Sequence, residues 1–379
     1  MSTRVLVLGA GFGGLEVTAG LSERFGSELE ITLIERNKHF VFGFSKLDLM
    51  FGKAPELAIN HPYSGLKKPG VNLIKANIES IDPVAKRVVT DAGIFEADYL
   101  VVALGADLDP SATPGMIESG HEFYSYAGAL EAKNALEHFT GGRVVIGVTS
   151  TPFKCPPAPS ETALLLHDFL EARGLRDISE ISVVMPFRTP VPPLPAASES
   201  LLAAFAERGI RWFAQRTIEN LDPSGKRVVF ADGDSMEFDL FLGVPKHVAP
   251  PVVAAAGMLE DGWIRVDPLS LETRYPGVFA IGDVTSVGTP KAGNFSEGQG
   301  QVVAERISAH INESPHTFEY DGNGICYVGF DAQHAARLNV TFVTGQHPYG
   351  SFDAPTTQIA AEKDAYATSR LLRWLGEDS

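Results

Sequence analysis

The stretch RVLVLGAGFGG at residues 4–14 decides the fold of this chain. Residues 4–8 form a short apolar strand, a glycine-rich turn follows, and residues 14–25 have the pattern of a helix. Residues 30–34 (EITLI) read as the next strand. Strands that alternate with helices and have few polar positions predict a parallel, doubly wound α/β sheet.

The same turn has the features of a dinucleotide site. Its glycines fit G-x-G-x-x-G and would let the backbone approach a pyrophosphate at the positive end of the helix. Glu35 ends the second strand, where an acid accepts hydrogen bonds from ribose hydroxyls. Strand, helix, strand and terminal acid together predict a bound dinucleotide rather than a glycine turn without a ligand. The glycines are Gly9, Gly11, Gly13 and Gly14.

An internal repeat extends this organisation. Residues 78–90 (IESIDPVAKRVVT) are echoed by residues 218–230 (IENLDPSGKRVVF). An Asp opens an apolar strand after each copy, at residues 98–105 and 239–245. The match predicts a duplication into two Rossmann-like domains with β-meander inserts, the second opening near residue 143.

The duplication divides the chain into three parts. Residues 1–107 and 249–315 would form a discontinuous dinucleotide-binding domain, and residues 108–248 a second Rossmann-like domain. Residues 316–379 would form a small strand-and-helix unit at an interface. The proline-rich run at residues 189–195 (TPVPPLP) is too rigid for a helix and should loop over a neighbouring surface.

Composition excludes several classes of function. Lys and Arg number 31 against 47 Asp and Glu, a net charge of −16, which argues against nucleic-acid binding. The apolar runs are strand-sized, so none is expected to span a bilayer, and a strand at Arg4 leaves no room for a secretory leader. Histidine and cysteine spacings predict no metal site and no haem attachment. These features predict a soluble cytoplasmic protein.

A second motif identifies the nucleotide. Residues 280–283 (AIGD) follow a strand and precede a helix at Ser296, and residues 101–105 (VVALG) look like a domain-junction strand. Here the chain resembles flavoproteins with two dinucleotide-binding domains, in which this Gly-Asp pair places a carboxylate on the ribityl chain of FAD. The alternative role of Asp283 is a turn cap. The resemblance implies FAD contacts for Gly9, Gly11, Phe12, Gly13, Gly14, Glu35, Arg36, Ile78, Ala103, Gly105, Gly282, Asp283, Lys291 and Ala292.

The second Rossmann-like domain departs from the nucleotide-binding pattern. Where glycines should follow its first strand, residues 148–161 read VTSTPFKCPPAPSE, and prolines cannot close backbone amides on a pyrophosphate. NAD(P)H binding there is disfavoured. The turn instead presents Cys155 beside Lys154, ahead of a helix with Ser160 as the expected N-cap. Positive potential at that position favours a thiolate, whereas the alternative is a buried, inert cysteine.

Three runs make the resemblance specific. Residues 152–161 (PFKCPPAPSE), 282–299 (GDVTSVGTPKAGNFSEGQ) and 324–327 (GICY) are similar, in order, to sulfide:quinone oxidoreductases and the flavoprotein subunit of flavocytochrome c sulfide dehydrogenases. In that family two cysteines lie over the flavin, bridge sulfur and pass electrons to FAD. The resemblance therefore implies this role for Cys155 and Cys326, the two cysteines of the chain, whose alternative is to be unrelated.

The resemblance assigns further roles. Glu161 matches an acid that would accept a proton, and Lys291 matches a lysine near the flavin pyrimidine edge, where a cation would stabilise reduced flavin. A helix-dipole acid and a solvated charge are the alternatives. The substrate would be sulfide or a related sulfur compound, and the acceptor quinone or a small electron-carrier protein. Residues 108–142 lack the third cysteine of many members, so FAD is expected to be non-covalent.

Two other functions stay open. A relative of type II NADH dehydrogenases or ferredoxin reductases would oxidise NADH without redox cysteines, and a non-catalytic flavoprotein would serve as a redox sensor or electron carrier. A helix expected at residues 357–376 would contact a membrane peripherally, form a homodimer or pack on its own domain. The residues that raise this question are Leu371, Leu372, Trp374 and Leu375, with Arg370 and Arg373.

Overall fold

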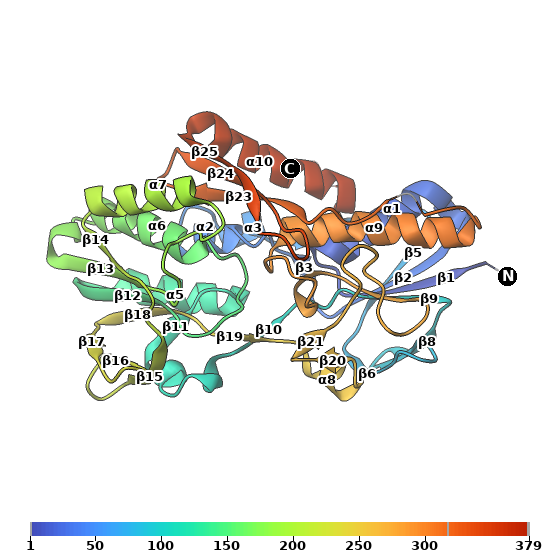
Figure 1. The fold of residues 1–379 in the computed structure, drawn as a ribbon, viewed down its shortest axis with the longest axis horizontal. Helices are drawn as coiled ribbons and strands as arrows, with labels where there is room; N and C mark the ends of the chain where they lie inside the picture. Colours follow the sequence, from blue (N-terminus) through green and yellow to red (C-terminus); the bar gives the residue numbers. More distant parts are fainter. Residues whose placement is uncertain (1, 317, 377–379) are drawn as a thin grey trace.

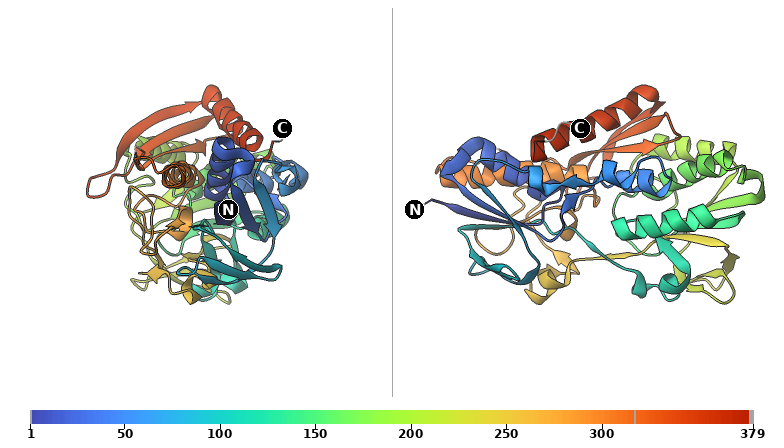
Figure 2. Two further views of the ribbon diagram at one scale, coloured as in Figure 1. Left: turned by 90° about the vertical axis from the view of Figure 1, so that its right-hand side faces the viewer. Right: turned by 180° about the vertical axis from the view of Figure 1, so that it is seen from behind.

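The computed structural model describes residues 2–316 and 318–376. Two five-stranded parallel sheets occupy opposite ends of an elongated molecule, and the C-terminal unit lies across both (Figures 1 and 2). The first sheet has the order β22 (Val278–Ala280), β9 (Tyr99–Val102), β1 (Arg4–Leu8), β2 (Glu30–Glu35) and β5 (Val71–Lys75). The second has the order β11 (Gly120–Glu122), β18 (Leu240–Val244), β12 (Gly142–Val148), β13 (Ser179–Val184) and β14 (Ile210–Phe213).

Helices cover both sheets. The first strand of the chain, β1, is therefore buried in a core. Val5 to Leu8 of β1 are fully buried, as the apolar run predicts. In Figure 1, α1 and α9 lie side by side over the first sheet, and α6 and α7 lie over the second. The longer helices are α1 (Phe12–Phe25), α5 (Tyr126–His138), α6 (Ala158–Ala172), α7 (Pro195–Glu207) and α9 (Gly293–Ile311). Short elements are α2 (Ser45–Met50), α3 (Glu56–Ile59), α4 (Met116–Ser119), α8 (Pro251–Ala255), β3 (His39–Phe40), β4 (His61–Pro62), β20 (Leu259–Glu260) and β21 (Trp263–Ile264).

The predicted duplication is confirmed in the β-meanders. Each meander has its register shift directly after its first residue, Ile78 in one copy and Ile218 in the other. Lys86 and Lys226 occupy the same turn position with φ of 50° and 48°, in the left-handed region. The strands are β6 (Ile78–Asp82), β7 (Arg87–Thr90) and β8 (Gly93–Glu96) in the first copy, and β15 (Ile218–Asp222), β16 (Arg227–Phe230) and β17 (Ser235–Glu237) in the second.

The Asp that opens the strand after each meander also has the same role twice. Asp98 accepts a hydrogen bond from the backbone N–H of Arg4, at 2.8 Å, and Asp239 accepts one from that of Arg143, at 2.8 Å. Each carboxylate thus fixes the start of the central strand of its own sheet. The repeat in the sequence is therefore a repeat of structure, in two Rossmann-like units with β-meander inserts.

The chain crosses between the two sheets twice at one place. β10 (Asp107–Asp109) and β19 (Lys246–Val248) pair antiparallel between them, as Figure 1 shows. The domain limits predicted near residues 107 and 248 fall at this crossing, and they stay a prediction.

The C-terminal unit packs on its own chain. Its sheet contains β23 (Asn323–Gly329), β24 (Ala335–Thr341) and β25 (Tyr349–Thr356), followed by α10 (Thr357–Leu375). Leu371, Trp374 and Leu375 are buried in the core of the first sheet, and Leu372 alone of the four stays exposed. Those three buried side chains are therefore not available to a lipid surface. Within residues 2–316 and 318–376, no helix combines the length and apolar character needed to cross a membrane.

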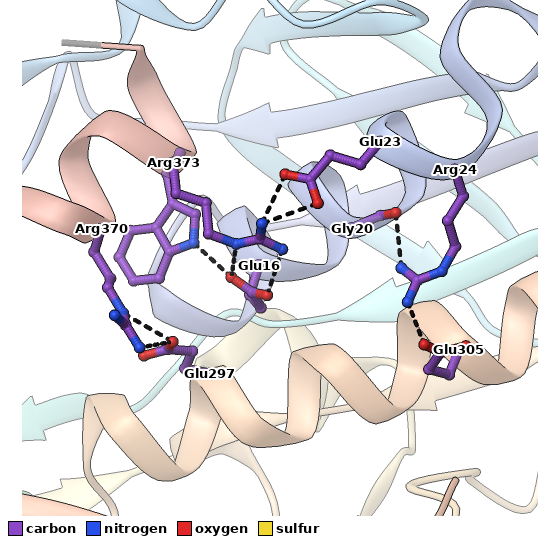
Figure 3. A network of polar contacts seen from close by, with 9 residues as sticks. Glu16, Gly20, Glu23, Arg24, Glu297, Glu305, Arg370 and Arg373 are labelled. Carbon is purple, nitrogen blue, oxygen red and sulfur yellow. Dashed lines mark hydrogen bonds and ion pairs between the residues drawn. The ribbon is translucent and has the colours of Figure 1, made fainter. Parts of the chain in front are cut away.

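Charged side chains fix the same helix (Figure 3). Arg373 donates two hydrogen bonds to Glu16 of α1, at 2.9 and 3.1 Å, and the indole N–H of Trp374 donates a third at 2.7 Å. Arg370 forms an ion pair with Glu297 of α9 at 2.7 Å. Glu16 and Glu297 are buried, so each needs such a partner. The basic residues that could have faced anionic lipid instead neutralise buried carboxylates.

Candidate active site

The glycine turn after β1 is built as a ligand cradle. Gly9 has a φ of 94°, and a Cβ on Gly14 would lie 1.9 Å from the carbonyl oxygen of Gly9, so both positions need glycine. A Cβ on Gly11 would meet no atom within 4 Å. Glu35 accepts a hydrogen bond from the backbone N–H of Ala10 at 2.9 Å. The backbone at Gly11 therefore faces open space at the start of α1, where a phosphate would be bound.

Two adjoining cavities extend from this cradle. One has a volume of about 830 Å³ and the other about 290 Å³. The larger is lined by the predicted residues Gly9, Gly11, Phe12, Glu35, Arg36, Ile78, Ala103 and Gly105. The smaller is lined by Gly11, Phe12, Gly13, Ala103, Gly105, Gly282, Asp283, Lys291 and Ala292. Of the residues assigned to FAD, only Gly14 lines neither cavity, because it packs beneath the turn.

The smaller cavity has the polar groups expected for an FAD site. The Oδ1 atom of the half-buried Asp283 is shielded from solvent and has no hydrogen-bond partner within the described chain, as expected of an atom that binds a hydroxyl of a ligand. Burial raises the pKa of Asp283, against the opposing charges of Lys154, Lys291 and Lys46. The unpaired carboxylate oxygen and the open cradle at Gly11 both fit FAD across the two cavities.

We predict that Gly11→Ala separates binding from folding. The added Cβ meets no protein atom and Gly11 has an ordinary φ of −81°, so the variant should fold and melt as the parent does. The Cβ would occupy the space of the pyrophosphate, so FAD affinity should fall at least about tenfold. Titration of the apoprotein with FAD, followed by flavin fluorescence, measures this.

Gly14→Ala is the matched control, because its Cβ would overlap Gly9 and should destabilise the fold itself. Unchanged FAD affinity in Gly11→Ala would show that the cradle holds no phosphate.

The smaller cavity also contains the two cysteines. Cys155 lies in the loop between β12 and α6, and Cys326 lies in β23 of the C-terminal unit. Both are free thiols. The backbone N–H of Cys155 donates to the carbonyl of Lys291 at 2.8 Å, which ties this loop to the other domain. Cys155 has a φ of 47°, a left-handed conformation that is rare for residues other than glycine. Such strain is typical of functional positions.

Two expectations about this segment are wrong. Helix α6 begins at Ala158 with Pro157 as its N-cap, so Ser160 is not the cap, and its buried hydroxyl has no partner within the described chain. Prolines start the helix there because their fixed φ suits its first turn. The prediction that Cys155 favours a thiolate also fails. Burial raises the pKa of Cys155, and it raises the pKa of Cys326 to about 12, because a charged sulfur loses its hydration there.

The raised pKa values predict an unusual alkylation profile. Both thiols should be neutral at pH 7, and the thiolate fraction should rise about tenfold per pH unit far above neutrality. The rate of iodoacetamide labelling of the reduced native protein should therefore still be rising at pH 10. The urea-unfolded protein is the control, and its rate should level off near pH 9. A native rate that levels off near pH 7 would contradict the raised pKa values of these thiols.

Glu161 lies beside the cysteines on α6. It is buried, and its Oε1 accepts a hydrogen bond from the backbone N–H of Gly329 at 2.9 Å and one from Lys363 at 3.2 Å. Gly329 ends β23, the strand of Cys326. Glu161 is thus more than a helix-dipole acid, because it joins α6 to the C-terminal unit at the sulfur centre.

Lys291 is buried and is not a solvated charge. Its Nζ donates to the carbonyl oxygens of Asp283 and Thr285, at 2.6 and 3.0 Å, and lies 3.3 Å from the centre of the Trp263 ring. Burial lowers the pKa of Lys291 to about 8, although Asp283 opposes this shift. The flavin-side position predicted for Lys291 stays a prediction.

A third cavity of about 500 Å³ adjoins the sulfur centre. Cys326 and Lys291 line both it and the smaller cavity. Its wall is mostly proline and aromatic side chains, and the run predicted to loop over a surface contributes Val191, Pro192 and Pro193. That run therefore covers an apolar chamber beside Cys326.

Several lining residues had no signal in the sequence. Lys46 and Tyr124 line both adjoining cavities, Tyr366 lines the smaller one, Trp263 lines the third, and Lys363 contacts Glu161. A lone lysine or tyrosine in a helix or loop has no distinctive spacing. Only the fold brings these side chains to the cysteines.

A dinucleotide cavity that ends at two thiols is typical of oxidoreductases that move electrons between a flavin and a sulfur centre. Residues 3–305 match the family described as "Pyridine nucleotide-disulphide oxidoreductase", and the chain belongs to this family. It is an FAD-dependent oxidoreductase, with sulfide:quinone oxidoreductases among its relatives.

Known proteins are similar to this chain along most of its length. The sulfide-quinone reductase of Aquifex aeolicus is 30% identical over 364 residues, covering 87% of this chain and 82% of the relative. The X-ray structure of the sulfide:quinone oxidoreductase from this organism superimposes with a TM-score of 0.88 at 25% identity, covering 98% of this chain and 91% of that chain. A type II NADH:quinone oxidoreductase of Staphylococcus aureus is 26% identical over 366 residues, covering 86% of this chain and 87% of the relative.

Proposed function

We propose that this enzyme oxidises sulfide, or a related small sulfur compound, at Cys155 and Cys326 and passes the electrons to quinone or a small electron-carrier protein. One observation carries the proposal: the two cysteines and Glu161 line the same cavity as Asp283 and the glycine cradle. The A. aeolicus relatives, whose names contain sulfide and quinone, support the choice of substrate and acceptor.

FAD would be held by the cradle residues, Glu35 and Asp283, without a covalent bond, since the described residues between 108 and 142 include no cysteine to attach it. When bound, FAD supplies a two-electron acceptor beside the sulfur centre. The protein's own part would be to keep the two sulfurs at one cavity and to accept and supply their protons.

One cycle of the proposed reaction consumes two hydrosulfide ions, and its atoms and electrons balance. The first attacks a Cys155–Cys326 disulfide, breaking that S–S bond and leaving one cysteine as a persulfide and the other as a thiolate. A second hydrosulfide takes the outer sulfur as HSS⁻ and leaves a thiol. Closing the disulfide again releases two electrons and one proton. The sum is that two HS⁻ give HSS⁻, one proton and two electrons.

Glu161 would accept the proton released when the disulfide closes. Its carboxylate is buried beside both cysteines, and each thiol pKa is raised partly by its negative charge. Lys363, at 3.2 Å, is the ion-pair partner that keeps this carboxylate compatible with burial. The pair therefore supplies a base where the thiols lack bulk water.

The electron acceptor would approach from the C-terminal unit, because Tyr327 and Tyr366 of that unit line the smaller cavity. The proposed location is cytoplasmic. Any peripheral contact with a membrane would use surfaces other than the buried part of α10. Cell fractionation with a salt wash tests this, and a protein released only by detergent would contradict it.

The test of the activity is a visible spectrum under anaerobic conditions. Sulfide should bleach the visible absorbance of the bound flavin in a single turnover, and a soluble quinone should restore that absorbance. Micromolar NADH should not bleach it, since prolines occupy the turn after β12. Rapid bleaching by NADH and none by sulfide would instead favour the activity named for the S. aureus relative.

A further inference from the structure

The ammonium group of Lys291 has three partners within the protein. Its side chain is buried, two backbone carbonyls accept from it, and the indole ring of Trp263 covers it at 3.3 Å. An ammonium has three N–H donors, so two carbonyls and one aromatic face satisfy all of them. This is a built cation site rather than a chance contact.

Trp263 contacts this cation and lines the apolar chamber. Trp263 lies in β21 and lines the apolar chamber together with Cys326, whereas Lys291 lines both that chamber and the smaller cavity. Lys291 therefore lies between the two spaces, and its indole partner lines the chamber. Without it, the ammonium would face an apolar chamber with no partner on that side.

An aromatic face matters here because the charge is costly to bury. Desolvation penalises an ammonium, and the negative face of an indole replaces part of the lost hydration. Other charges also act on Lys291. The Asp283 carboxylate stabilises its charge and Lys154 opposes it, while Lys46 and His247 lie near the same group of charges. The aromatic contact is one further interaction that favours the charged form of Lys291.

We propose that Trp263 is a positioning residue that keeps Lys291 charged and fixed at the cavity wall, and thereby sets the reduction potential of the bound flavin. Uptake of two electrons and one proton gives the flavin ring a net negative charge, which a nearby fixed cation stabilises. The inference rests on the proposed FAD site. It does not rest on sulfide as substrate, so its test uses no sulfide.

The test is a reductive titration of the FAD-loaded protein with dithionite and a reference dye. Trp263→Leu should keep FAD and shift the equilibrium toward oxidised flavin about tenfold, which is about 30 mV for a two-electron couple. Trp263→Phe, with a weaker aromatic face, should fall between. Trp212→Phe, in β14 of the second sheet, is the matched control and should not change the potential.

A double-mutant cycle decides whether the indole acts through the lysine. In a Lys291→Met background, Trp263→Leu should cause no further shift, because the charge is already gone. If Trp263→Leu loses FAD, the cycle is run with Trp263→Phe. An unchanged potential in the Trp263 variants, or a shift that adds fully to that of Lys291→Met, would overturn the proposal.

The pH dependence gives an independent readout. The wild-type potential should show a break near pH 8, where Lys291 loses its charge on raising the pH. Removing the indole destabilises the charged form, so the break should move to lower pH in Trp263→Leu. A break at the same pH in both proteins would assign it to another group. Failure of sulfide to bleach the protein would leave all three measurements intact, so the two proposals fail separately.

Discussion

Replacing Cys155 with serine is expected to leave FAD bound and to lower the rate of flavin reduction by sulfide on the order of 10³-fold or more. A hydroxyl oxygen cannot form the disulfide that hydrosulfide attacks, nor hold a sulfur atom as a persulfide. Cys155 lines the cavity without contributing to the glycine cradle, so the cofactor should remain. Anaerobic stopped-flow measurement at the flavin absorbance band gives the rate.

Cys326→Ser should lower the rate of flavin reduction by sulfide to the same extent. The double variant should show no further loss of rate, because the two sulfurs act as one unit. Dithionite should still reduce the flavin in all three proteins, which shows that the loss lies in the sulfur step. Normal bleaching by sulfide in either single variant would remove that cysteine from the mechanism.

Glu16→Ala is expected to cost about 3 kcal/mol of folding free energy. The carboxylate is buried and accepts three hydrogen bonds, two from Arg373 and one from the indole of Trp374 (Figure 3). Its removal leaves the fully buried indole N–H without an acceptor and Arg373 without its principal partner. Urea unfolding of the FAD-free protein, followed by circular dichroism, measures the loss.

Glu23→Ala is a control within the same cluster. Glu23 also accepts from Arg373, at 2.7 and 2.9 Å, but it lies at the surface, where an ion pair contributes about 1 kcal/mol or less. Glu16→Gln should be intermediate, since its amide oxygen can still accept from Trp374. Equal losses for Glu16→Ala and Glu23→Ala would mean that burial does not determine the importance of this pair.

The fold could be predicted because local signals and global architecture agree. The apolar run at residues 4–8 and the glycines after it are sufficient for a strand, a tight turn and a helix. The repeated segments at residues 78–90 and 218–230 duplicate even their register shift, and their sequences match closely at the same positions. Most of the architecture could therefore be predicted from motifs that have a fixed local geometry.

The chemistry of the site could be predicted less well, because burial and distant partners control it. A cysteine ahead of a helix is a sequence feature, but the desolvation that raises its pKa comes from the surrounding fold. The sequence singles out Glu161 as a site residue. Its partner Lys363 lies 202 positions away, and nothing in the sequence around Lys363 predicts this contact. The contact of Trp263 with Lys291 likewise joins two segments that only the packing of β21 brings together.

The enclosure of Glu16 by Arg373 and Trp374 has a consequence for biosynthesis. Trp374 follows Glu16 by 358 positions, so a chain emerging from the ribosome exposes this carboxylate until residues 373 and 374 have been made. Cys326 and Lys363 are also made late, long after the glycine turn. A nascent chain that extends past residue 155 but ends before residue 326 therefore contains the glycine turn and Cys155 but lacks the second cysteine of the sulfur centre.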